Sequence, residues 1–400
     1  MIEANETGNV SFSLVEDEEG LSSLTDHLAG QRCVGVDVEA DSMYHYEEKV
    51  CLIQMSTVTD NFIIDPLKIS DLSPLEKVFN DPRIEKIFHG ADFDVRSLRR
   101  DFSFQIQGLF DTQIAARFSG KGDLSLARLV KDYFGVELEK KYRKRDWTVR
   151  PLPVEMLVYG VFDSLYLPEL SRILRRELKD KGRLDWVLEE CEILSRVEAA
   201  GNGGRPFYMR FKGAGRLSPR SLAILESVLR FRDTVAARRD VPHFKVIGNE
   251  TVKSLVEAKP VTIEDLKAAG ILSPKQVHGL GEGLVREISS ALALSDTDLP
   301  VYPSRSKHGH APGSSGRYLK LKRWRDRRAA DMELDPPVIF PNNVLKAIAD
   351  SPPVGPKDLE SIPGIRQWQV RLFGKDICDV IRVRQASSRV FRKGKRVRGE

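Results

Sequence analysis

Three short segments in the first half of the chain carry residue types that can perform chemistry. They contain Asp37 and Glu39 in an apolar run, Asp94 after a second apolar run, and Tyr159 with Asp163 further along. Carboxylates are costly to place in apolar surroundings unless they are paired or bind a cation, and clustered carboxylates repel one another. Oxygen ligands of this kind favour Mg²⁺ or Mn²⁺ over zinc. The segments therefore predict a two-metal centre of the type that cleaves phosphodiesters.

The spacing of the first residues predicts how the fold presents them. Residues 33–39 are typical of a strand, in which side chains two apart point to the same face. Asp37 and Glu39 can therefore hold one ion between them. We expect a helix to begin near Asp92 and to place Asp94 in its first turn, where the helix dipole favours a negative charge.

Tyr159 and Asp163 are four residues apart in a segment with helical character. Side chains at this spacing lie one above the other on one helix face, so the tyrosine can orient a water on a metal held by the aspartate. We expect one ion to be held by Asp37, Glu39 and Asp163. The second ion is expected between Asp37 and, through water, Asp94.

The elements that must position these residues indicate a mixed α/β domain. Strands are predicted at 10–15, 33–39, 50–56, 61–64 and 84–89. Helices are predicted at 21–29, 72–79, 95–101, 112–118, 126–133, 153–175 and 184–199. Early strands and late helices predict a central sheet with helices packed on it. Turn residues between positions 57 and 61 predict a hairpin there.

The order of the motifs resembles that of a known enzyme family. Asp-x-Glu, His-Gly-Ala-Asp-x-Asp and Tyr-x-x-x-Asp follow one another as in the tyrosine branch of the DEDD exonuclease superfamily. The flanking sequences resemble ribonuclease D and the nuclear-exosome exonuclease over residues 15–200: Cys51-Leu52-Ile53-Gln54, Asn61-Phe62-Ile63-Ile64-Asp65, Phe110-Asp111-Thr112-Gln113 and Asp146-Trp147-Thr148-Val149-Arg150-Pro151-Leu152-Pro153. The resemblance implies a ribonuclease H-like α/β fold.

The same resemblance implies roles for individual residues. The metal ligands would be Asp37, Glu39, Asp94 and Asp163, and Tyr159 would help to place the attacking water. Substrate contacts would come from Gln54, His89, Lys144, Arg145, Trp147 and Arg150. We do not assign His89 to the metal, because a histidine at a strand end is more often a structural hydrogen-bonding residue.

The second half of the chain contains a divergent internal repeat at an offset of 92 or 93 residues. Leu229-Arg230-Phe231-Arg232-Asp233 matches Lys322-Arg323-Trp324-Arg325-Asp326, and Val246-Ile247 matches Val338-Ile339. A repeat of this length indicates two copies of a domain. Both copies resemble the helicase-and-ribonuclease-D C-terminal (HRDC) domain, a small all-α module that binds nucleic acid.

Breaker residues and composition divide the chain into five segments. We predict an exonuclease domain at 1–205, a first HRDC-like domain at 206–295, a flexible linker at 296–316, a second HRDC-like domain at 317–385 and a basic tail at 386–400. The Gly-rich boundary near Gly201 further predicts that the exonuclease domain has a core of its own.

Charge and composition agree with a protein that acts on nucleic acid. The net charge is only +5, but basic residues gather at 140–145, 317–328 and 389–399, and these runs also contain aromatic residues. Phosphate attraction and base stacking are typical of sequence-tolerant binding to single strands. The four cysteines form no CxxC pair, the N-terminus is unlike a signal peptide, and no apolar run suits a membrane. We expect a monomer located in the cytoplasm.

Together these features predict a divalent-metal-dependent 3′–5′ exoribonuclease that releases nucleoside 5′-monophosphates from structured RNA with a single-stranded 3′ end. The resemblance implies transfer RNA precursors as substrates. One alternative is a DNA 3′–5′ exonuclease, a distinction that depends on 2′-hydroxyl contacts; the sequence lacks the GxxxxGK[ST] motif of an attached helicase. The other is a non-catalytic RNA-binding scaffold, which loss of a carboxylate would favour, and none is missing.

Overall fold

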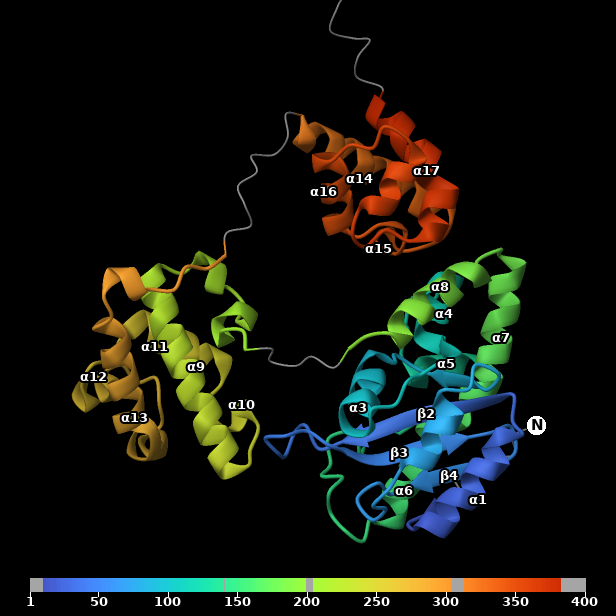
Figure 1. The fold of residues 1–400 in the computed structure, drawn as a ribbon, viewed down its shortest axis with the longest axis horizontal. Coiled ribbons are helices and arrows are strands. Elements are labelled where there is room, and N and C mark those ends of the chain that lie inside the picture. The colour runs from blue at the N-terminus through green and yellow to red at the C-terminus, as the bar shows by residue number, and fades with distance from the viewer. Residues whose placement is uncertain (1–9, 140, 199–203, 304–312, 383–400) are drawn as a thin grey trace, which may run out of the picture.

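A six-stranded mixed sheet organises the N-terminal domain of the computed structural model, which describes residues 10–139, 141–198, 204–303 and 313–382 (Figure 1). The strands are β1 (Ser13–Val15), β2 (Cys33–Ala40), β3 (Val50–Ser56), β4 (Asn61–Ile64), β5 (Glu85–Phe88) and β6 (Leu109–Asp111). Their order across the sheet is β1-β4-β3-β2-β5-β6. Strand β3 pairs antiparallel with β2 and β4, whereas the other three pairings are parallel. The predicted hairpin is therefore confirmed as β3 and β4.

Helices cover this sheet, as predicted. They are α1 (Glu18–Ala29), α2 (Glu76–Phe79), α3 (Asp92–Phe102), α4 (Thr112–Ser119), α5 (Leu126–Phe134), α6 (Val154–Leu165), α7 (Leu167–Asp180) and α8 (Leu184–Ser195). The prediction of one helix over 153–175 is wrong, because the helix breaks at Tyr166. Pro168 stands in the first turn of α7 and has no N–H with which to continue the bonding of α6.

Two helical domains follow, and each repeats the same internal contacts. The first contains α9 (Pro219–Arg239), α10 (His243–Val246), α11 (Asn249–Ala258), α12 (Ile263–Ala268) and α13 (Pro274–Leu292). The second contains α14 (Ser314–Asp331), α15 (Pro336–Ile339), α16 (Asn342–Asp350) and α17 (Gln367–Arg382). Arg232 donates to Asn249 Oδ1 at 2.8 Å, and Arg325 donates to Asn342 Oδ1 at 2.8 Å. The divergent sequence repeat thus has a structural counterpart.

The second helical domain shares one continuous hydrophobic core with the exonuclease domain. The ring of Trp368 stacks on Trp186 with centroids 4.6 Å apart, and its edge meets Phe118 at 5.7 Å. Arg366 Nε lies 2.9 Å from Glu190 Oε1 beside this stack. The expectation that the exonuclease domain has a separate core is therefore wrong. The first helical domain, by contrast, has its own core.

The predicted basic tail at 386–400 and positions 304–312 of the predicted linker lie outside the described residues. The described start of that linker packs on the first helical domain, where Tyr302 lies 6.0 Å from the ring of Tyr208. Among the described residues, no helix combines the length and the apolar character needed to span a membrane.

Candidate metal centre

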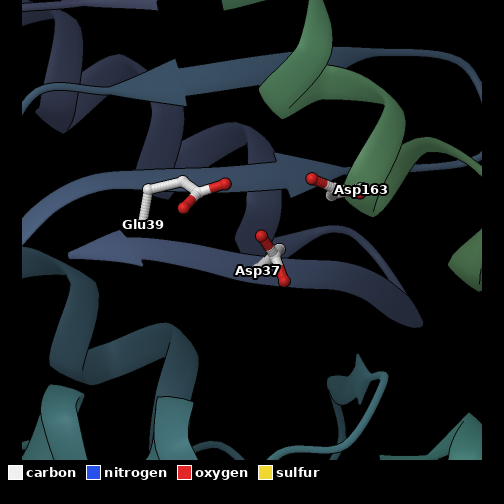
Figure 2. A group of neighbouring side chains, drawn as sticks. All are labelled: Asp37, Glu39 and Asp163. Carbon is white, nitrogen blue, oxygen red and sulfur yellow. The ribbon is translucent and has the colours of Figure 1, made fainter. Parts of the chain in front are cut away.

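Three carboxylates from two elements converge at the centre of the sheet. Asp37 and Glu39 come from β2, and Asp163 comes from α6, which lies across the sheet. One oxygen of each residue lies within 4.8 Å of the other two (Figure 2). The same-face geometry expected for positions two apart in a strand is thus observed for Asp37 and Glu39.

Two glycines allow α6 to approach the sheet this closely. A Cβ atom on Gly35 would lie 2.6 Å from the carbonyl oxygen of Ser164, and one on Gly160 would lie 2.9 Å from Gln54 Nε2. The buried hydroxyls of Ser56 and Ser164, 2.7 Å apart, join α6 to β3 at the same level. Sequence reasoning missed both glycines; Gly35, in a run of valines, was the available signal.

Asp94 lies in the first turn of α3, as predicted, but outside the group of three. The start of this helix is held by Asp111, whose carboxylate accepts hydrogen bonds from the N–H of Gly90 at 3.1 Å and of Ala91 at 2.8 Å. The same carboxylate caps α4 through the N–H of Gln113 at 2.7 Å. Asp111 thereby fixes the turn that presents Asp94. The Phe110-Asp111-Thr112-Gln113 motif contains this aspartate but did not predict its role.

The electrostatics of these carboxylates are those expected of a cation site. Burial, followed by the charge of Asp163, raises the pKa of both Asp37 and Glu39 well above the ordinary values. Burial and the charge of Asp111 raise the pKa of Asp94 to about 8. Burial raises the pKa of Asp163 to about 7, against the lowering effect of a hydrogen bond. The donor set fits divalent cations, because positive charge would relieve both the repulsion and the desolvation.

Tyr159 lies one turn before Asp163 and hydrogen-bonds to its carboxylate, and burial with the nearby acidic charges raises the pKa of the phenol. Its ring is enclosed by two aromatic neighbours, Tyr142 at 5.8 Å and Trp147 at 6.2 Å between centroids. The hydroxyl is therefore held at the cluster in its protonated form.

These shifts predict how stability responds to pH in the absence of metal. Unfolded aspartates titrate near pH 3.9, so Asp94 and Asp163 bind more protons when folded. Their stabilisation is present below about pH 4 and is lost as the pH rises through their folded pKa values. We expect the Tm in EDTA to fall between about pH 5 and 8.5, and Mg²⁺ to reduce that fall because it binds only the folded site.

Calorimetry tests the same linkage directly. Binding of Mg²⁺ near neutral pH should release protons, which titrations in buffers of different ionisation enthalpy detect. The Asp163→Asn variant should release fewer. A Tm that is flat with pH in EDTA, together with metal binding without proton release, would contradict the assignment.

Two of the predicted substrate residues, Gln54 and His89, belong to or follow the strands next to β2. Gln54 stands opposite Asp37 in the β2–β3 register and is fully buried, with no partner for its amide atoms among the described residues. His89 Nδ1 lies 2.9 Å from Thr112 Oγ1, and burial lowers the pKa of the imidazole. Substrate contact by either residue stays a prediction.

The remaining predicted substrate residues occupy the segment before α6. Trp147 is only 1% exposed and packs behind the site. Arg150 forms a salt bridge with Asp65 at 2.6 Å and also donates to three backbone carbonyls. This geometry gives Trp147 and Arg150 structural partners, whereas the side chains of Lys144 and Arg145 are exposed. Their substrate contacts likewise stay predictions.

Two protein-family models match this chain. A family model described as 3′-5′ exonuclease matches residues 12–179, and the HRDC domain model matches residues 221–288 and 314–381. The fold and site thus define a 3′–5′ exonuclease with two C-terminal HRDC domains.

Relatives matched over nearly their whole length are ribonuclease D proteins. Ribonuclease D of Acidiphilium cryptum (strain JF-5) is 29% identical over 387 residues, which cover 96% of each chain. Ribonuclease D of Zymomonas mobilis is 28% identical over 388 residues, again 96% of each. The chain belongs to the ribonuclease D family, and it is a 3′–5′ exoribonuclease.

Solved structures share the architecture. The catalytic core of RRP6 from Trypanosoma brucei is 31% identical, with a TM-score of 0.62 over 72% of this chain and 81% of that one. Escherichia coli RNase D superposes with a TM-score of 0.72 over 94% of this chain and 100% of that one, at 23% identity. The second match extends the similarity in fold to the helical domains.

Proposed function

We propose that the exonuclease uses two divalent cations, Mg²⁺ or Mn²⁺, to remove nucleoside 5′-monophosphates one at a time from a single-stranded 3′ end. The observation that carries this proposal is the convergence of Asp37, Glu39 and Asp163 within 4.8 Å, with raised pKa values. Asp37, Glu39 and Asp163 would hold one ion. Asp37 and Asp94 would hold the other.

Each residue of the site has a separate task in this proposal. When bound, the cations supply the charge that activates a water and stabilises the leaving 3′-oxygen. The protonated hydroxyl of Tyr159 orients the attacking water from beside Asp163. Gln54 packs beneath α6 at Gly160 and supports the turn that presents Asp163. Asp111 keeps Asp94 at the start of α3.

A direct assay tests the proposed reaction. RNA and DNA of equal sequence, labelled at the 5′ end, are incubated with the full chain in Mg²⁺, in Mn²⁺ and in excess chelator. We expect a ladder that shortens from the 3′ end of the RNA, release of 5′-monophosphates, and no products in chelator. Faster degradation of DNA, or unchanged turnover in chelator, would refute the proposal.

The Tyr159→Phe variant tests the role of the hydroxyl. If the hydroxyl orients the water, turnover should fall by about 10²-fold, the order expected for one positioned proton-handling group. RNA affinity should change little, because the ring still fills the space between Tyr142 and Trp147. Single-turnover rates and filter binding separate the two effects. An equal loss in binding and turnover would instead make Tyr159 a substrate contact.

For the substrate in the cell we propose transfer RNA precursors and other structured RNAs with a single-stranded 3′ end. The support is the pair of HRDC domains, which offer contacts to the body of a folded RNA. We further propose a monomer in the cytoplasm, with its four cysteines present as free thiols. Processing of a labelled precursor against an unstructured RNA of equal length, and the mass in solution, test these points.

A further inference from the structure

The loop between β2 and β3 links the metal centre to the first HRDC domain. It begins directly after the strand of Asp37 and Glu39 and extends toward α10 (Figure 1). His45 Nδ1 lies 2.7 Å from Asp240 Oδ2, and the N–H of Tyr46 donates to the other oxygen of Asp240 at 3.1 Å. The hydroxyl of Tyr46 donates to Asp233 at 2.8 Å. Asp233 and Asp240 of the HRDC domain therefore hold this loop at His45 and Tyr46.

Tyr44 in the same loop contacts a second element. The ammonium group of Lys245 lies 4.5 Å from the centre of the Tyr44 ring, on the HRDC side. The hydroxyl of Tyr44 donates to the backbone carbonyl of Lys144 at 2.7 Å. This bond spans 100 residues, so Tyr44 joins the HRDC domain to the chain just before α6.

Lys144 belongs to the basic segment, residues 141–145, which lies beside the metal centre. The ring of Tyr142 meets the ring of Tyr159 edge-on at 5.8 Å. The charge of Arg143 lowers the pKa values of both Glu39 and Asp163, so this guanidinium is within electrostatic reach of the cluster. The cationic side chains of the segment are exposed and are thus available to phosphate groups.

We infer that Tyr44 is a positioning residue that couples docking of the first HRDC domain to placement of the basic segment, whose cations bind the phosphates nearest the 3′ end of the RNA. This inference rests on the proposed function and deepens it. Its consequence is that the HRDC domain supports the hydrolysis of RNAs too short to contact it. A domain that acted only by gripping the body of the RNA would have no such effect.

The test compares single and double variants of the full chain on a single-stranded tetranucleotide. Tyr44→Phe removes the bond to Lys144 and keeps the ring. Asp240→Gly removes the carboxylate that holds the loop, and glycine suits the left-handed backbone there (φ 47°). Lys259→Gly is the matched control, since Lys259 ends another helix of the same domain in the same conformation (φ 50°).

We expect Tyr44→Phe and Asp240→Gly each to lower kcat/KM by about tenfold, within the loss caused by a misplaced positioning group. The loss should lie mainly in KM, because the phosphates are bound in both ground and transition states. The double variant should be no slower than Asp240→Gly, since residues that act through one another are not additive. Lys259→Gly should match the wild type. Unchanged kcat/KM in Tyr44→Phe, or additive losses, would overturn the inference.

Hydrogen exchange gives a second readout that does not depend on activity. The amides of residues 141–148 should exchange faster in Tyr44→Phe and in Asp240→Gly than in Lys259→Gly, at unchanged Tm. If the wild type cleaved no RNA, the proposed function would fail, and the exchange experiment would still decide the coupling. Equal exchange in all variants would refute it.

Discussion

Replacing Asp37 with asparagine is expected to abolish RNA hydrolysis while the fold is retained. The amide has the shape of the carboxylate but lacks the charge that both proposed ions require. Metal ions provide several kcal/mol of transition-state stabilisation, and each 1.36 kcal/mol is a factor of ten, so a loss of about 10³-fold or more is expected. Single-turnover rates at saturating Mg²⁺ measure it.

The same substitution should affect stability in the opposite direction. In the metal-free protein Asp37 is repelled by Asp163, Asp94 and Glu39, so the uncharged variant should have an equal or higher Tm in EDTA. The matched control is Asp132→Asn, an exposed aspartate of α5 paired with Arg128, which should leave turnover unchanged. Wild-type turnover in Asp37→Asn would refute the two-metal site.

Replacing Gly35 with alanine is expected to disable the site without altering any ligand. The added methyl group would meet the Ser164 carbonyl oxygen at 2.6 Å, Leu167 Cβ at 3.0 Å and Pro168 Cδ at 3.1 Å. Helix backbone and a proline ring cannot move alone, so α6 must shift and carry Asp163 with it. Displacements of about 1 Å cost on the order of 10²-fold in rate, and overpacking costs about 1–3 kcal/mol in stability.

Alanine at two other glycines should have a smaller effect on turnover or none. Gly160→Ala should be milder, because its nearest neighbour is the flexible end of the Gln54 side chain at 2.9 Å. Gly122→Ala should be silent, because no atom lies within 4 Å of the added methyl. Turnover, Tm and Mn²⁺ affinity measured together separate a shifted ligand from an unfolded protein. Full activity in Gly35→Ala would show that α6 needs no such approach.

Local periodicity predicted most of the candidate site. The strand that carries Asp37 and Glu39, the first-turn position of Asp94 and the helical spacing of Tyr159 and Asp163 all depend on backbone geometry within a few residues. The family resemblance added the metal roles. Strand β6 was not predicted, because its three residues are too few to show an alternating pattern.

Contacts between distant segments escaped the sequence analysis for a physical reason. Trp147 and Arg150 were predicted as substrate contacts, and the fold surrounds one with core and pairs the other with Asp65. A glycine at position 35 signals a close approach but does not identify Ser164 as the neighbour, and the bond from Tyr44 to Lys144 has no sequence signature. Such contacts arise only when separate elements pack.

The sequence by itself determined which carboxylates and which tyrosine are candidates for the site, the kind of metal that such oxygen ligands favour, and the presence of two helical copies after the exonuclease domain. Only the tertiary structure decided how the copies attach. Stacking of Trp368 on Trp186 merges the second copy with the catalytic core, whereas the first keeps its own core and holds the loop beside the metal centre. The residue type determines which chemistry a side chain can perform, but the packing of distant segments determines which groups it contacts.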